Sequence, residues 1–140
     1  MTRDPRTDPQ PARLVLIVDD DPVFVSQLTK ILVERGYLVL GAADGEAALD
    51  LLNQHELNFT LAIVDVFLPR SNGFELITRL SAPENKGNLK IIAVSTGRQK
   101  VLDTAISLGA DAGVAKSPAG TPLDARQWLS EVLLQIGRPE

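Results

Sequence analysis

Residues 14–22 read LVLIVDDDP. An uninterrupted apolar run of this length predicts a strand that is buried on both faces of a parallel sheet. Three aspartates follow the run, and Asp21 followed by Pro22 is typical of a helix N-cap with proline at the first helical position. This stretch therefore predicts a central strand whose carboxyl end presents carboxylates before the chain enters a helix.

The same alternation continues along the chain. Four more apolar runs predict strands at residues 37–40, 61–64, 90–94 and 113–115. Apolar residues recur at helical spacing between and after these runs, as in Phe24, Leu28 and Ile31, and predict five helices. Five strands and five helices in strict alternation predict an α/β, doubly wound, five-stranded parallel sheet with helices on both faces.

Length and composition restrict the class of protein. The 140 residues suit one domain, and we expect a disordered or extended tail over 1–12, a folded domain over 13–136 and a short tail over 137–140, with no output domain after it. The absence of cysteine excludes disulfides and thiolate metal sites. A net charge of −4 gives no basic footprint for nucleic acid, and no apolar run is long enough for a membrane span, so we expect a cytoplasmic protein.

Residues able to do chemistry follow four of the five predicted strands. Asp19 and Asp20 follow the first strand, Asp65 the third, Ser95 the fourth and Lys116 the fifth. In open α/β sheets, ligands bind outside these carboxyl ends. Clustered carboxylates repel one another unless a cation joins them, and Mg²⁺ prefers such oxygen ligands. Taken singly, each residue also fits a plainer role: a solvated loop acid, a capping serine or a surface lysine.

Taken together, these residues resemble the response-regulator receiver domain over residues 13–136. The motifs that carry the resemblance are residues 14–22, Asp65 with Leu68-Pro69 and Asn72-Gly73, residues 91–95 and Lys116. The resemblance implies the flavodoxin-like (βα)5 strand order 2-1-3-4-5.

The resemblance also implies a set of roles. Asp65 would accept a phosphoryl group from a histidine kinase or a histidine phosphotransfer protein. Asp19, Asp20, Asp65 and the main-chain carbonyl of Phe67 would hold Mg²⁺. Lys116 would pair with the phosphoryl group, and Ser95 would move towards it. A downstream protein of unknown identity would bind the face made by the fourth helix, fifth strand and fifth helix, and phosphorylation could promote a homodimer. The domain would be a signalling switch and not an enzyme with turnover.

The sequence departs from the family pattern near Lys116. The family usually has an aromatic residue three positions before this lysine, where this chain has Gly113, and Ser117 intervenes before Pro118. A glycine has no ring to move inward, so a weakly switching or non-switching binding module is the alternative reading. A phosphatase is a third, but its usual second acid is replaced by Phe67. We expect the Phe67 side chain to shield Asp65 from water.

Overall fold

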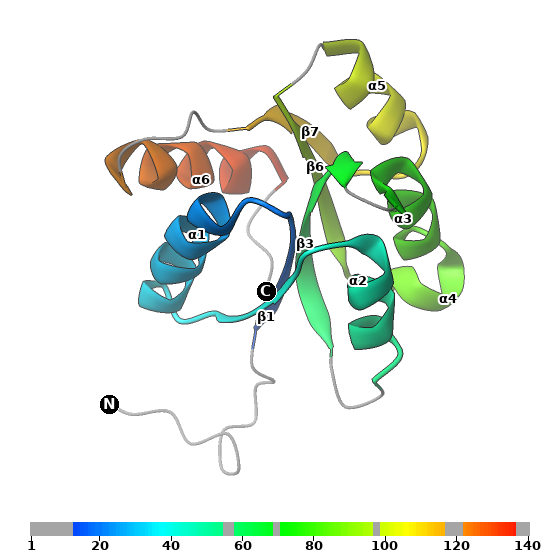
Figure 1. Cartoon of the computed structure of the whole chain (residues 1–140), viewed down its shortest axis with the longest axis horizontal. Coiled ribbons are helices and arrows are strands. Elements are labelled where there is room, and N and C mark those ends of the chain that lie inside the picture. The colour runs from blue at the N-terminus through cyan, green and yellow to red at the C-terminus, as the bar shows by residue number, and fades with distance from the viewer. Residues whose placement is uncertain (1–12, 55–57, 69–70, 97–98, 117–121, 137–140) are drawn as a thin grey trace.

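The computed structural model describes residues 13–54, 58–68, 71–96, 99–116 and 122–136. Five strands form one parallel sheet in the order β2-β1-β3-β6-β7 (Figure 1). In chain order, these strands are β1 (Leu14–Val18), β2 (Leu38–Ala42), β3 (Phe59–Asp65), β6 (Lys90–Ser95) and β7 (Ala112–Ala115). They correspond one to one with the five predicted strands, and the order 2-1-3-4-5 is confirmed.

Helices cover both faces of the sheet. The six helices of the described chain are α1 (Pro22–Glu34), α2 (Gly45–Leu52), α3 (Gly73–Leu80), α4 (Pro83–Lys86), α5 (Gln99–Ser107) and α6 (Pro122–Ile136). Buried residues of α1 and α6 share one core with the sheet, and residues of α2, α3 and α5 share the other (Figure 1). The molecule is therefore the doubly wound sandwich that the alternation of elements predicts.

Strand β1 lies inside both cores. All five of its residues are buried; Leu14, Leu16 and Val18 contribute to one core, and Val15 and Ile17 to the other. This is the alternation expected when successive side chains point to opposite faces. The continuous apolar run thus has its physical reason in a central position with helices on both sides.

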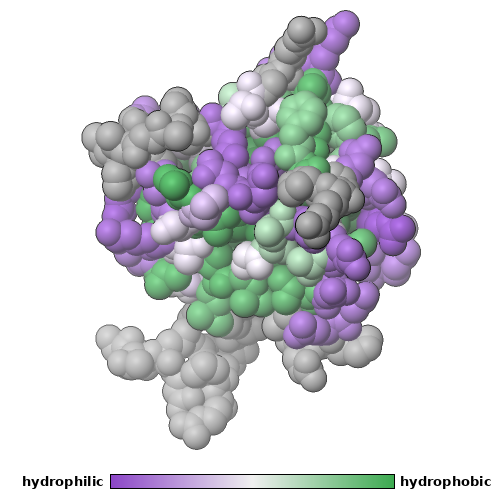
Figure 2. Space-filling view, in the orientation of Figure 1, coloured by the Kyte–Doolittle hydropathy of each residue, from purple (hydrophilic) through white to green (hydrophobic). Residues whose placement is uncertain are grey.

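The edge strand β2 differs from the prediction of burial on both faces. Its Leu38 side chain is 56 % exposed, because the strand has a neighbour on one side only. Figure 2 shows apolar surface across the lower centre of the view, where β2 crosses the front of the molecule in Figure 1.

The turn from β1 into α1 holds the aspartates in place. Asp21 is the N-cap: its Oδ1 accepts the N–H groups of Val23 at 3.0 Å and Phe24 at 3.3 Å. Pro22 occupies the first helical position, as predicted. Asp19 and Asp20 therefore remain between the strand and the helix, at the carboxyl edge of the sheet.

The segment between α3 and β6 holds a helix beyond the five predicted from helical spacing. This short helix, α4, begins at Pro83, where proline suits the first helical turn. A small antiparallel hairpin of β4 (Phe67–Leu68) and β5 (Ser71–Asn72) was also not predicted. None of the described helices combines the length and apolar character needed to cross a bilayer. The predicted tails and the Ser117–Pro118 bond lie outside the described residues.

Gly113 permits a close approach between α5 and β7. A Cβ atom built at this position would lie 2.9 Å from Leu102 Cβ and 3.2 Å from the Leu102 carbonyl oxygen. A side chain here would therefore push against the backbone of α5. In place of the aromatic residue that the family usually has, this chain thus has a glycine that lets α5 pack directly against β7.

We expect Gly113→Ala to destabilise the fold by about 1–3 kcal/mol, the usual cost of overpacking. The measurement is urea unfolding of both proteins. Gly41→Ala is the matched control, because a Cβ on this glycine of the other edge strand would meet Val25 Cγ1 at an ordinary 3.6 Å. Equal losses of stability in the two variants would contradict the packing argument.

Candidate functional site: a carboxylate cluster around Lys116

Parallel strands bring residues from four distant parts of the sequence to one edge of the sheet. Asp19 directly follows β1, Asp65 ends β3, Ser95 ends β6 and Lys116 directly follows β7. Asp19, Asp65 and Ser95 are buried, with exposed fractions of 3 %, 7 % and 0 %. The convergence predicted from the strand ends is therefore present.

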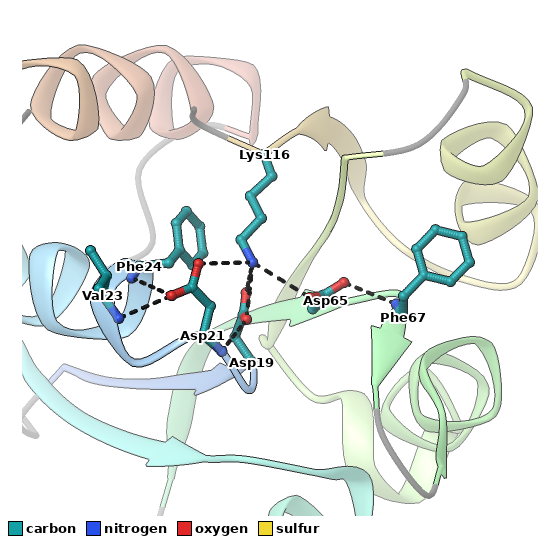
Figure 3. A network of polar contacts seen from close by, with 7 residues as sticks. All are labelled: Asp19, Asp21, Val23, Phe24, Asp65, Phe67 and Lys116. Atoms are coloured by element: carbon teal, nitrogen blue, oxygen red, sulfur yellow. Dashed lines mark hydrogen bonds and ion pairs between the residues drawn. The ribbon is translucent and has the colours of Figure 1, made fainter. Parts of the chain in front are cut away.

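The Lys116 ammonium group is the centre of the cluster (Figure 3). Its Nζ atom lies 3.1 Å from Asp19 Oδ1, to which it donates a hydrogen bond, and 3.0 Å from Asp19 Oδ2. The same atom lies 3.6 Å from Asp65 Oδ2 and 3.7 Å from Asp21 Oδ2. Lys116 thus bridges the carboxylates at the ends of β1 and β3 and is no ordinary surface lysine.

The acidic residues also meet the requirements of a divalent cation. Asp19, Asp20 and Asp65 each offer a carboxylate oxygen, and these oxygens lie within 4.8 Å of one another. Asp19 Oδ2 is buried and, although close to Lys116, has no hydrogen-bond partner of good geometry. A hard cation with oxygen ligands would satisfy this atom and offset the repulsion among the three carboxylates. The donor set fits Mg²⁺.

Burial governs the electrostatics of the cluster. Burial raises the pKa of Asp19 in spite of the Asp21 N–H and Lys116. Burial likewise raises the pKa of Asp65, against the lowering effect of the Phe67 N–H and with a further contribution from the charge of Asp19. For Lys116 burial acts to lower the pKa, but the hydrogen bond to Asp19 and the surrounding negative charges outweigh it and raise the pKa. Lys116 therefore remains a cation at neutral pH.

Two residues with predicted roles lie beside the cluster. The main-chain carbonyl of Ser95 accepts the N–H of Lys116 at 2.9 Å, which ties the end of β6 to the lysine. The Phe67 N–H donates to Asp65 Oδ1 at 2.9 Å and orients that carboxylate. The Phe67 ring, however, is 58 % exposed and points away from Asp65 (Figure 3), so the expectation that it shields the carboxylate from water is not met.

Three residues of this region were not assigned a role from the sequence. The Phe24 ring lies beneath the Lys116 ammonium at 4.7 Å, and Trp128 donates from Nε1 to the Ala115 carbonyl at 2.6 Å. Gly73 packs against the backbone of residues 65 and 66. Helical spacing correctly indicated a buried Phe24, but spacing alone cannot show which buried ring faces a charge.

Comparison with known proteins agrees with this geometry. Residues 15–126 match the response regulator receiver domain family. The chain belongs to this family. Its receiver domain is 33 % identical over 114 residues to the response regulator GtcR of Aneurinibacillus migulanus, with 81 % of this chain and 45 % of that protein covered. It is 34 % identical over 97 residues to the transcriptional regulatory protein CpxR of Escherichia coli, with 69 % and 40 % covered. The chain thus spans less than half the length of these relatives.

Solved receiver domains share the fold. A CheY-like receiver domain protein from Methanospirillum hungatei superposes with a TM-score of 0.71 at 29 % identity, over 89 % of this chain and 96 % of that one. A response regulator from Burkholderia pseudomallei, solved with a phosphorylated aspartic acid, a calcium ion and citrate, gives 0.68 at 27 % identity, over 88 % and 74 %.

Proposed function

We propose that this receiver domain is a phosphorylation switch that accepts a phosphoryl group on Asp65. The observation that carries the proposal is the convergence on Lys116 of Asp19 and Asp65, two buried carboxylates at the carboxyl ends of different strands. A positive charge fixed beside a buried carboxylate is what a transferred phosphoryl group requires, because phosphoryl transfer depends mainly on positioning and charge neutralisation.

The chemistry is a single displacement at phosphorus. A carboxylate oxygen of Asp65 attacks the phosphorus of a phosphohistidine donor, the P–N bond breaks, and its electron pair leaves with the imidazole. The product is an acyl phosphate. The Phe67 N–H, which donates to Asp65 Oδ1, holds the carboxylate in one orientation during the attack. Lys116 pairs with the incoming phosphoryl oxygens.

Asp19, Asp20, Asp65 and the Phe67 main-chain carbonyl would hold Mg²⁺. When bound, the ion would neutralise charge on the transferred phosphoryl group. Ser95, fully buried at the end of β6, would contribute its hydroxyl after transfer.

The donor we propose is a histidine kinase or a histidine phosphotransfer protein in the cytoplasm. The reaction runs once for each phosphoryl group received, so the domain acts as a phosphoacceptor with self-dephosphorylation and not as an enzyme with external substrate. The downstream partner would bind the face formed by α5, β7 and α6, and phosphorylation could also bring two copies together.

Gly113 favours one alternative, a binding module that switches weakly. Leu102 of α5 lies directly against Gly113, so no side chain at position 113 stands between β7 and α5. A movement of Ser95 therefore has no side chain there through which it could reach α5. Such a module would still be a phosphoacceptor if a phosphoryl group can be transferred to Asp65. The following experiment tests that transfer.

Incubation of the full chain with a small phosphodonor, with Mg²⁺ and then with excess chelator, tests the proposal. We expect Mg²⁺-dependent labelling, lability to hydroxylamine as for any acyl phosphate, and mass-spectrometric assignment to Asp65. A label that is absent, or that maps to another residue, would refute the proposed function.

Mg²⁺ should stabilise the receiver domain in a pH-dependent way. Because burial raises the pKa of Asp19 and Asp65 above the ordinary value of 3.8, the folded chain holds these protons to higher pH than the unfolded chain. Their contribution to stability therefore falls as the pH rises through and above that value. Ligand linkage predicts a gain of about 2.7 kcal/mol at a Mg²⁺ concentration one hundred times Kd. The gain should disappear at acid pH, where protons replace the ion; urea unfolding with Na⁺ of equal ionic strength is the control.

Replacing Lys116 by alanine should separate acceptance from response. We expect labelling of Asp65 to survive at a reduced rate, because the nucleophile remains, and any conformational response to be lost, because no cation links the phosphoryl group to β7. Backbone amide NMR shifts with and without beryllofluoride and Mg²⁺ measure the response. A full wild-type response in Lys116→Ala would contradict this role for the lysine.

A further inference from the structure

Trp128 makes contact with the main chain next to Lys116. It lies on α6 with an exposed fraction of 8 %, and it is the one tryptophan of the chain. Its Nε1–H donates a 2.6 Å hydrogen bond to the main-chain carbonyl of Ala115, the residue before Lys116. The indole thus holds the end of β7 from which the Lys116 side chain reaches the carboxylate cluster.

The same indole also supports the ring beneath the lysine. The Lys116 Nζ atom lies 4.7 Å from the centroid of the Phe24 ring, a cation–π distance. The Phe24 and Trp128 rings meet edge to face, with centroids 5.5 Å apart and an interplanar angle of 74°. Trp128 therefore contacts both groups that position Lys116. It bonds to the main chain at Ala115, and it packs against the Phe24 ring that lies beneath the ammonium group.

Phosphorylation would change the balance of charge around the ammonium group. Lys116 Nζ is now nearer to Asp19, at 3.0 Å, than to Asp65, at 3.6 Å. Asp65 and Phe24 lie on opposite sides of the ammonium group (Figure 3). A phosphoryl group on Asp65 therefore adds negative charge on the side away from Phe24, and a cation bound by Asp19 competes with Lys116 for that carboxylate. Both changes draw the ammonium group towards Asp65. Any such movement alters its contact with Phe24, and Phe24 packs on Trp128.

We propose that Trp128 is a positioning residue for Lys116 and that the Lys116–Phe24–Trp128 contacts carry the state of the carboxylate cluster to α6. The inference rests on the proposed function and specifies its regulation. Gly113 has no side chain to transmit such a change, whereas Phe24 and Trp128 connect the lysine to α1 and α6 through a cation–π contact and an edge-to-face ring contact. The face formed by α1 and α6 is then the first part of the surface to respond.

Because Trp128 is unique, its fluorescence reports on these contacts directly. The first experiment adds Mg²⁺ alone, then beryllofluoride with Mg²⁺, to the full wild-type chain and to Phe24→Leu. The ¹⁹F NMR signal of bound beryllofluoride is recorded on the same samples. Val23→Ala, a change at an exposed neighbouring position of α1, is the matched control. We expect a fluorescence change in the wild type and the control that is much smaller in Phe24→Leu, since leucine fills part of the same volume but loses the ring contacts with Lys116 and Trp128.

The two readouts keep the two proposals apart. A bound ¹⁹F signal with unchanged Trp128 fluorescence in the wild type overturns the inference and leaves the proposed function standing. Equal fluorescence changes in the wild type and Phe24→Leu overturn it too. A missing ¹⁹F signal counts against the proposed function, and the response to Mg²⁺ alone then decides the inference by the same comparison.

A second variant tests the hydrogen bond to Ala115. Trp128→Phe keeps an aromatic ring against Phe24 but removes the N–H donor. We expect the rate of Asp65 labelling to fall about fivefold, the equivalent of one neutral hydrogen bond, without a loss of Mg²⁺ affinity, since Lys116 competes with the ion for Asp19. Leu134→Ala, at a position of the same helix that is 76 % exposed, should label at the wild-type rate. Labelling of Trp128→Phe at the wild-type rate would overturn the positioning role.

Discussion

An Asp65→Asn variant should lose labelling by a small phosphodonor entirely, by more than about a hundredfold, because removing the attacking atom removes the reaction. The fold should survive. The amide oxygen of asparagine can still accept the Phe67 N–H that now bonds to Asp65 Oδ1 at 2.9 Å. The substitution also removes a buried negative charge from the neighbourhood of Asp19. The loss of labelling would therefore be chemical and not a result of unfolding, which circular dichroism of the same sample checks.

Asp21→Asn is the matched control for this prediction. Asp21 Oδ2 lies 3.7 Å from Lys116 Nζ, almost as near as Asp65 Oδ2 at 3.6 Å, so each variant removes one negative charge close to the lysine. Asparagine also keeps the N-cap of α1, since it is as good a capping residue as aspartate. We expect near wild-type labelling of Asp21→Asn. Persistent labelling of Asp65→Asn, or an equal loss in Asp21→Asn, would show that Asp65 is not the acceptor.

The sequence predicted the five strands of the main sheet and the five longer helices because most of these elements carry their own local signal. The apolar run of β1 and the Asp21-Pro22 cap indicate a buried strand followed by a helix without any knowledge of the rest of the chain. The strand order came from resemblance, since no local signal states which strands are neighbours. The exposure of Leu38 was missed for the same reason: an apolar residue in an edge strand resembles one in a central strand until the order is known.

The sequence also allowed us to predict which residues meet at the site. Parallel strands must bring their carboxyl ends to one edge, so the proximity of Asp19, Asp65 and Lys116 follows from the fold. Side-chain direction does not follow from it. The outward Phe67 ring and the Phe24 ring beneath Lys116 depend on packing among elements far apart in sequence, and the sequence pattern marks both simply as apolar.

Gly73→Ala should be the most destabilising of the glycine substitutions considered. A Cβ atom on Gly73 would lie 2.5 Å from the Val66 carbonyl oxygen and 2.6 Å from that of Asp65. Both are backbone atoms, so no side chain can rotate away. Either the start of α3 or the segment that follows β3 must move, and we expect a loss of more than about 3 kcal/mol, measured by urea unfolding.

The close contact at Gly73 links the stability of the fold to the position of Asp65. The N–H of Gly73 donates to the Val66 carbonyl at 3.2 Å, and Asn72 caps α3 by accepting the Phe74 N–H at 2.8 Å, so α3 begins directly against the residues that follow Asp65. A displaced Val66 would shift the Phe67 N–H that orients the Asp65 carboxylate. We therefore expect the folded fraction of Gly73→Ala to be labelled more slowly, while Gly41→Ala keeps the wild-type rate and stability. Wild-type stability of Gly73→Ala would mean that α3 does not start in contact with the backbone of Asp65 and Val66.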